Sequence, residues 1–277
     1  MLTADLLRQL YPAAPDAMVE AFAEQAAEVL SEFEIADGRN RLHFFLAQVG
    51  HESGGKPVEE NLNYSAKRMT QVWPSRFPTL ASTEGFAKNP RALANRVYGG
   101  RMGNAANNDD GWNFRGRGLI QITGRDGYAN TGEAAGLKLV ENPDFATNPK
   151  HALRVAGGFW TWKKINARCD GGDFTGVTKT INGGIVGLQD RFKWLEKVQD
   201  LVPWPLDGAP PPGPEPVLSI AQLKAIQVRL KALGLYAGSI DGVFGKRSRA
   251  ALKVFQADKD LKANGRLTEE TLAALGI

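Results

Sequence analysis

The segment HESGG, residues 51–55, contains the residues whose types and spacing most directly suggest chemistry. Phe45 and Val49 lie about one turn apart on the apolar side of the helix that the preceding residues predict, and the same spacing continues to Glu52. We therefore expect the Glu52 carboxyl group on the core-facing side of this helix, at the end where two glycines stop it. A carboxyl group with apolar neighbours resists ionisation, so we expect a raised pKa. Such an acid can protonate a leaving glycosidic oxygen.

On position alone, the alternative for Glu52 is a helix end whose carboxylate bends into solvent. A zinc protease is excluded, because its helix needs a second histidine four residues after the first, and that position after His51 holds Gly55. Three histidines and one cysteine, Cys169, are too few for a convincing zinc cluster, and we expect neither a metal nor another cofactor. The single cysteine also excludes an internal disulfide.

Two further acids, Glu59 and Glu60, follow in a segment that loops back after Pro57. One of them could face Glu52 across a groove. Two carboxyl groups about 6.5–9.5 Å apart would leave room for a water molecule between the base and the sugar, and hydrolysis would then invert the anomeric carbon. Adjacent acids in a loop are usually solvated, and that alternative stays open at this point.

The elements that must position these residues are mainly helical. Apolar spacing predicts helices over residues 16–33, with Asp16 as the cap, and over residues 42–53, 151–162, 175–181 and 190–202. The Gly- and Asn-rich residues 99–118 predict a loop, and residues 119–123, LIQIT, predict a short strand. Since no long alternating pattern indicates a sheet, the expected fold class is mainly α.

A proline-rich stretch divides the chain. Seven of the 14 residues in 203–216 are prolines, which favours an extended, semi-rigid spacer. We therefore expect a large domain over residues 1–202, a linker over residues 203–216 and a small domain over residues 217–277. Helical patterns that include Ile220, Ser248 and Thr268 predict three helices in the small domain.

Composition excludes several classes of protein. With 277 residues, of which 43% are hydrophobic and 23% charged, the chain is typical of a globular protein and not of a disordered, collagen-like or coiled-coil one. It has no apolar run near the roughly 18–20 residues of a membrane span. The first residues lack a basic segment before a long apolar stretch, so we expect no secretory signal and no stable membrane insertion.

The net charge of +4 comes from the C-terminal part. Residues 219–277 contain 10 Lys and Arg against 5 Asp and Glu, whereas residues 1–218 contain 24 against 25. A basic domain favours an anionic partner such as nucleic acid, a membrane face or a wall polymer, and a solubilising surface is the equally good alternative. It lacks the interleaved aromatic residues that bind single strands, so we expect no nucleic acid.

Four ordered stretches of the large domain carry a family resemblance: HESGG, ENLNYS at residues 60–65, GRGLIQITGR at residues 116–125 and TINGG at residues 180–184. Together they resemble glycoside hydrolase family 19, and within it the phage endolysins that cleave peptidoglycan more than the plant chitinases. The resemblance implies a lysozyme-like, family-19 chitinase-like helical catalytic domain. It assigns the general acid to Glu52 and the general base to Glu60, with Glu59 as the neighbouring alternative. The hydroxyl that helps to hold the attacking water falls on Thr123.

The resemblance also implies sugar-binding residues. Gln121 and Asn182 match polar residues that line the cleft, and Tyr128 matches a tyrosine after the IQIT run. Arg191 matches a basic residue behind the cleft, and we expect His51 to support Glu52 by hydrogen bonding. Four aromatic residues in loop-rich stretches are candidates for stacking on sugar rings, with a place in a core as the alternative; these are Tyr64, Trp73, Tyr98 and Trp112. The predicted substrate-binding residues are His51, Tyr64, Gln121, Tyr128, Asn182 and Arg191.

The small domain resembles the peptidoglycan-binding domain of wall hydrolases. The resemblance rests on Asp241-Gly242-x-x-Gly245, on a following helix with Phe255-Gln256 and on the closing residues TEETLAALGI. A generic helical turn is the alternative for so short a motif. Basic side chains at the start of the second helix could meet the carboxylates of wall peptides or another anionic surface. The predicted wall-binding residues are Asp241, Lys246, Arg247 and Arg249.

These resemblances imply an endolysin of the muramidase type, which hydrolyses β-1,4 glycosidic bonds of peptidoglycan with inversion. A chitinase that cleaves N-acetylglucosamine polymers and a non-catalytic protein that binds wall glycans are the alternatives. As an endolysin, the protein would be a monomer that binds peptidoglycan. It would accumulate in the host cytoplasm and reach the wall in the periplasm through a pore-forming holin.

Overall fold

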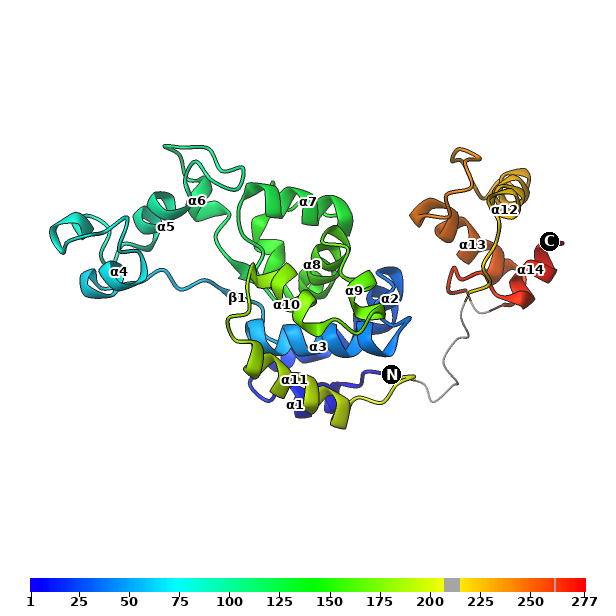
Figure 1. Ribbon diagram of the computed structural model, residues 1–277, viewed down its shortest axis with the longest axis horizontal. Coiled ribbons are helices and arrows are strands. Elements are labelled where there is room, and N and C mark those ends of the chain that lie inside the picture. Colours follow the sequence, from blue (N-terminus) through cyan, green and yellow to red (C-terminus); the bar gives the residue numbers. More distant parts are fainter. Residues whose placement is uncertain (207–214, 262) are drawn as a thin grey trace. The chain divides into compact units, whose positions relative to one another are not determined.

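The computed structural model describes residues 1–206, 215–261 and 263–277. It divides into two compact units, Met1–Pro211 and Pro212–Ile277, which we call the large unit and the small unit (Figure 1). The expected fold class is confirmed, because the described residues of both units form mainly α-helices. None of the described helices is both long enough and apolar enough to cross a membrane.

The main body of the large unit is a set of packed helices, and α3 (Arg39–Ser53) is its most enclosed element. Every residue from Leu42 to Gly50 in α3 is buried. A helix that is covered on all sides lies in the core, so its side chains can reach solvent only near its ends. The other helices of the main body are α1 (Ala4–Leu10), α2 (Asp16–Glu32), α7 (Arg125–Ala135), α8 (Pro149–Trp162), α9 (Asn166–Asp170), α10 (Phe174–Asn182) and α11 (Leu188–Leu201), together with the 3-10 helix η2 (Pro143–Ala146).

The predicted cap of α2 is wrong by one residue. Pro15 is the N-cap, and Asp16 is the first residue inside the helix. A carboxylate in the first turn still stabilises the helix, because it faces the positive end of the helix dipole.

A second lobe of the large unit has its own hydrophobic cluster, separate from the core of the main body: Leu62, Met69, Phe77, Leu93, Ala94 and Val97. Its helices are α4 (Ala66–Val72), η1 (Ala81–Thr83), α5 (Pro90–Tyr98) and α6 (Asp110–Asn113). In Figure 1 this lobe extends to the left of the main body. The loop expected over residues 99–118 is therefore only partly irregular, since it contains α6 and β2 (Arg117–Gly118).

A two-stranded antiparallel sheet forms where the chain leaves the main body for the second lobe and where it returns. It pairs β1 (Val58–Glu59), which follows α3, with β2, so that Val58 lies opposite Gly118. The strand expected over residues 119–123 is wrong. The chain turns after β2, and Ile122 pairs with Arg117. The apolar side chains of this segment are buried in the core of the main body instead of alternating across a sheet.

The small unit contains the three expected helices, α12 (Ile220–Ala232), α13 (Lys246–Asp258) and α14 (Glu269–Leu275). Their apolar faces meet in one cluster, which includes Ile226, Leu230, Leu252 and Phe255. The middle of the predicted linker, residues 207–214, lies outside the described residues. At its beginning, Trp204 and Leu206 pack against the core of the large unit.

A buried glutamine fixes the first turn of the small unit. The side-chain oxygen of Gln227 accepts a hydrogen bond from the Gly242 N–H at 2.8 Å. Its amide nitrogen donates to the Asp241 carboxylate at 3.0 Å, to the Val243 carbonyl at 3.1 Å and to the Ser248 hydroxyl at 3.3 Å. A single side chain thus joins α12, the turn and the start of α13.

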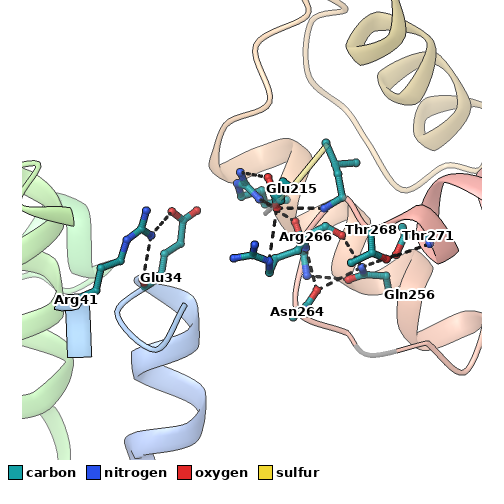
Figure 2. A network of polar contacts seen from close by, with 11 residues as sticks. Glu34, Arg41, Glu215, Gln256, Asn264, Arg266, Thr268 and Thr271 are labelled. Carbon is teal, nitrogen blue, oxygen red and sulfur yellow. Dashed lines mark hydrogen bonds and ion pairs between the residues drawn. The ribbon is translucent and has the colours of Figure 1, made fainter. Parts of the chain in front are cut away.

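A second buried glutamine, Gln256, fixes the next turn in the same way (Figure 2). It accepts from the Gly265 N–H at 2.7 Å and donates to the Asn264 side chain, the Arg266 carbonyl and the Thr271 hydroxyl. Each partner of Gln256 has a counterpart in the set around Gln227, in the same order along the chain. The small unit is therefore built from two similar halves, each with a helix, a glutamine and a glycine turn that leads into the next helix.

Candidate active site

Glu52 lies in the last turn of α3 and forms an ion pair with α11. Its Oε1 accepts a hydrogen bond from Arg191 Nη2 at 2.5 Å. The side chain of Glu52 is 16% exposed and that of Arg191 is 2% exposed. The purely apolar surroundings expected for Glu52 are therefore wrong, because a buried guanidinium group holds one carboxyl oxygen.

A chain of buried polar groups fixes Arg191 from behind. Its second terminal nitrogen donates to the Gln48 side-chain oxygen, and Gln48 donates to the Thr178 hydroxyl at 3.0 Å. These groups come from α11, α3 and α10, so the interiors of three helices determine where Glu52 lies. Since Arg191 is buried, the expected contact between this residue and substrate is wrong, and Arg191 positions Glu52 instead.

A second pair lies next to the first on the same two helices. His51 Nδ1 is 2.7 Å from Asp190 Oδ2. The two consecutive residues His51 and Glu52 therefore meet the two consecutive residues Asp190 and Arg191. The approach of α11 requires glycine before it, because a Cβ atom at Gly187 would lie 2.6 Å from His51 Cε1 and this residue has a φ of 75°.

Glu60 directly follows β1, and both of its carboxyl oxygens have a donor. Oε1 accepts from the Tyr98 hydroxyl at 2.6 Å, and Oε2 accepts from the Gly116 N–H at 3.3 Å. The Glu60 N–H in turn donates to the Gly116 carbonyl at 2.8 Å. The carboxylate is half-buried and held from two directions.

The neighbouring Glu59 is engaged differently. Its carboxylate accepts from Arg115 at 2.6 Å and from Arg117 at 2.8 Å, and both arginine side chains are buried. Burial raises the pKa of Glu59, but the hydrogen bonds from Arg117 and Arg115 outweigh this effect and hold the pKa below its usual value. Glu59 is therefore the anion of a two-arginine clamp, and this favours Glu60 over Glu59 as a base.

Gln121 lies near Glu60, and Thr123 lies against the backbone of Gln121. The Gln121 amide donates to the Val58 carbonyl at 2.9 Å and to the Gly118 carbonyl at 3.0 Å, and the Thr123 hydroxyl donates to the Gln121 carbonyl at 3.2 Å. A Cβ atom at Gly116 would lie 3.1 Å from Gln121 Oε1 and 3.4 Å from Glu60 Oε2, so these two side chains converge at this glycine. Glu60 and Gln121 are thus neighbours, and Thr123 is linked to them through the backbone of Gln121.

The structure shows protein neighbours around two of the residues predicted to contact sugar, Tyr128 and Tyr64. Tyr128 is fully buried, and its hydroxyl donates to the Arg115 carbonyl at 2.8 Å. Burial raises its pKa to about 12. The predicted sugar contact of Tyr128 is therefore wrong, and this residue supports the arginine clamp. Tyr64 is half-buried and packs against Trp73, with ring centroids 5.0 Å apart, in the cluster of the second lobe.

The end of α10 lies on the surface. Asn182 is exposed, and its amide donates to the Val186 carbonyl at 3.3 Å. The loop that leads to α11 leaves the side chains of Ile185 and Val186 exposed. This loop ends at the glycine that contacts His51, so it lies on the Glu52 side of the site.

The residues predicted to bind the wall fall into three groups. Asp241 accepts from Gln227 and from the Val243 N–H, and these hydrogen bonds lower its pKa. Arg249 donates to both oxygens of Glu215, at 2.8 and 3.1 Å, so its predicted role as an available anion-binding group is wrong for this structure. Arg247 is exposed, and the side chain of Lys246 lies outside the described part.

Several residues of the site were missed by the sequence analysis: Gln48, Arg115, Arg117 and Asp190. The signal for the clamp was the alternation of Arg115 and Arg117 around a glycine, opposite a short segment with two acids. The signal for the second pair was the sequence Asp190-Arg191, whose charges complement those of His51-Glu52. In residues 1–206, 215–261 and 263–277, no group of His, Cys, Asp and Glu side chains is arranged to hold a metal ion.

Known proteins are similar to both units. Residues 219–275 match the family profile described as "Putative peptidoglycan binding domain". Over 151 residues the chain is 40% identical to a glycosyl hydrolase family 19 domain-containing protein of Haemophilus influenzae, and the match covers 54% of this chain and 74% of that protein. An endochitinase of Arabidopsis thaliana is 40% identical over 75 residues, which are 27% of this chain and 26% of the endochitinase. The crystal structure of chitinase C from Streptomyces griseus aligns at 20% identity with a TM-score of 0.46, over 72% of this chain and 76% of that one.

Proposed function

This chain belongs to glycoside hydrolase family 19, and from that premise we propose that it hydrolyses β-1,4 glycosidic bonds of bacterial peptidoglycan. The observation that carries the proposal is the pair of carboxyl groups at Glu52 and Glu60, each of which is fixed by a different kind of partner. Glu52 is held by a buried guanidinium group, and Glu60 by a phenol and a backbone N–H. Two carboxyl groups in different surroundings are what an acid and a base require.

In the proposed reaction, Glu60 removes a proton from a water molecule as its oxygen bonds to the anomeric carbon. The bond from that carbon to the glycosidic oxygen breaks, and Glu52 gives its proton to the departing oxygen. Because Arg191 binds Oε1 of Glu52, the oxygen that gives the proton in this step is Oε2. Thr123 holds the water, since a hydroxyl group can both donate and accept. The product has the inverted anomeric configuration.

The small unit supports peptidoglycan as the substrate, through its similarity to a peptidoglycan-binding domain. A domain that binds the wall raises the concentration of the enzyme at its substrate. We extend the proposal to a phage endolysin of the muramidase type, a monomer that accumulates in the host cytoplasm and reaches the periplasmic wall through a pore-forming partner. The second candidate is a chitinase, and the 40% identity to an endochitinase over 75 residues favours it.

Mass spectrometry of digested peptidoglycan tests the proposal. Digestion in H₂¹⁸O should release fragments with labelled, reducing N-acetylmuramic acid ends. Reducing N-acetylglucosamine ends would replace the muramidase assignment, and anhydro-muramic ends or free peptides would contradict hydrolysis of a glycosidic bond. Faster cleavage of chitin oligomers than of peptidoglycan would favour the second candidate. Glu52→Gln should reduce turnover at least about 1000-fold without unfolding the protein, because it removes the proton donor.

A further inference from the structure

Tyr98 is the last residue of α5, in the second lobe. Its hydroxyl group nevertheless reaches Glu60, the base in the proposed reaction. The hydroxyl oxygen is 2.6 Å from Glu60 Oε1. We propose that Tyr98 is a positioning residue, which holds the Glu60 carboxylate in the orientation needed to remove a proton from water. This inference rests on the proposed function and deepens it, because it names a residue that the two-carboxylate chemistry does not include.

The second lobe fixes the place of the phenol. Leu93, Ala94 and Val97, on the same helix, are buried in the cluster of that lobe, and the Tyr98 ring packs against this cluster. The Tyr98 carbonyl accepts from the Asn104 side chain at 3.0 Å, just beyond the end of the helix. A ring held by its helix, its cluster and its carbonyl has little freedom to turn away from Glu60.

Electrostatics gives this hydrogen bond one direction. Burial, and then the nearby Glu60 carboxylate, raise the pKa of Tyr98 well above the usual value of a phenol. The hydroxyl therefore stays protonated over the whole working range of pH, and it is the donor in the hydrogen bond to Glu60. The other ionisable groups that act on Tyr98 are Tyr64, which raises its pKa, and Arg101, which lowers it.

The two donors of Glu60 define the plane of its carboxylate. Tyr98 holds Oε1 from the second lobe, and the Gly116 N–H holds Oε2 from the segment before β2. A carboxylate oxygen has two acceptor positions, so each oxygen still has one for a water molecule. Without Tyr98 the carboxylate would keep one donor and could rotate about its last bond. The loss would appear in the chemical step more than in the binding of the sugar.

The test is Tyr98→Phe in the full chain, assayed on soluble peptidoglycan fragments by the release of reducing ends. We expect kcat to fall about 10-fold with KM within twofold of the unchanged protein, since the phenol acts only through the base. An unchanged kcat, or a KM that rises as far as kcat falls, would overturn the proposal.

A matched control removes a buried phenolic hydroxyl elsewhere. The Tyr11 hydroxyl donates to the Leu46 carbonyl at 2.8 Å in the core of the main body. Tyr11→Phe should lower the melting temperature and leave kcat and KM unchanged. If Tyr98→Phe gives only this pattern, its role is structural and the proposal fails. If the unchanged protein releases no reducing ends from peptidoglycan or chitin fragments, the proposed function fails instead, and the two failures are therefore distinct.

Discussion

A glutamate–arginine pair occurs in each unit, and the two pairs differ in burial. In the large unit, the side chains of Arg191 and Glu52 are 2% and 16% exposed. In the small unit, those of Arg249 and Glu215 are 27% and 23% exposed. A buried guanidinium group that loses its carboxylate is left as an uncompensated charge, whereas a partly exposed one regains water. The first pair should therefore be far more costly to disturb.

The two pairs also differ in the part of the molecule that each one fixes. Arg191 connects Glu52 to Gln48, so its position is set by a network inside the protein. Arg249 connects Glu215, at the end of the predicted linker, to the Gly265 carbonyl in the second turn of the small unit. One pair fixes the carboxyl group that we propose as the acid, and the other fixes a segment of chain. Under that proposal, the same chemical contact serves activity in one unit and stability in the other.

Among the changes that compare the two pairs, the largest effect is expected for Arg191→Lys. A lysine ammonium group keeps the charge but cannot reproduce the planar geometry with which arginine reaches both Gln48 and Glu52. Because Glu52 would then move, we expect turnover of soluble fragments to fall about 100-fold, measured by the release of reducing ends. Arg249→Lys is the matched control, and it should change this turnover less than twofold. Equal losses in the two variants would contradict the difference between the pairs.

An intermediate effect is expected when the small unit is removed. The chain should end at Leu206 and not at residue 202, because Trp204 and Leu206 pack against the core of the large unit. Lysis of whole walls should fall about 10-fold at low enzyme concentration, since the local concentration at the wall is lost. Turnover of soluble fragments should stay unchanged. A complete loss on soluble fragments would mean that the small unit completes the active site.

Local features of the molecule could be predicted well from the sequence. The spacing from Phe45 and Val49 to Glu52 predicted the end of α3, since periodicity records which side of a helix is buried. Glycine turns and apolar spacing likewise predicted the three helices of the small unit. What spacing could not supply is the partner of a side chain. Arg191 is 139 residues from Glu52 in the sequence, and only the packing of α11 on α3 brings them together.

Burial and tertiary contacts explain the remaining differences between the predicted and the observed roles of residues. A tyrosine beside a glycan-binding motif can contact a sugar or support the motif from inside, and the sequence is the same in both cases. Tyr128 takes the second role, because its side chain on α7 is buried in the core of the main body. Arg249 is a similar case, since the acid that occupies it comes from the linker and not from a ligand. Both outcomes depend on tertiary contacts that no local pattern records.

The smallest effect, and the one that depends on pH, is expected for Glu215→Gln. Burial raises the pKa of Glu215, but the hydrogen bonds from Arg249 and from the Leu267 N–H outweigh it, so the pKa is lowered. A carboxyl group whose pKa is lower in the folded state stabilises that state above its unfolded pKa, and this contribution is lost as the pH falls through the folded value. For a partly exposed pair the contribution is about 0.5–1 kcal/mol, which corresponds to a decrease in melting temperature of roughly 2–8 °C for a unit of this size.

Calorimetry of the full chain at several pH values measures this effect, with the transition of the small unit identified by its absence from the chain that ends at Leu206. The difference between the unchanged protein and Glu215→Gln should be present at pH 7, should begin to shrink near the unfolded pKa of about 4.3, and should disappear once the pH is below the lowered folded pKa. Glu270→Gln is the control, because Glu270 is exposed in the first turn of α14 and contributes only through the helix dipole. A difference that persists at low pH would mean that the shape of the side chain, and not its charge, holds the linker to the small unit. The Arg249–Glu215 pair could then no longer be treated as a more exposed version of the Arg191–Glu52 ion pair.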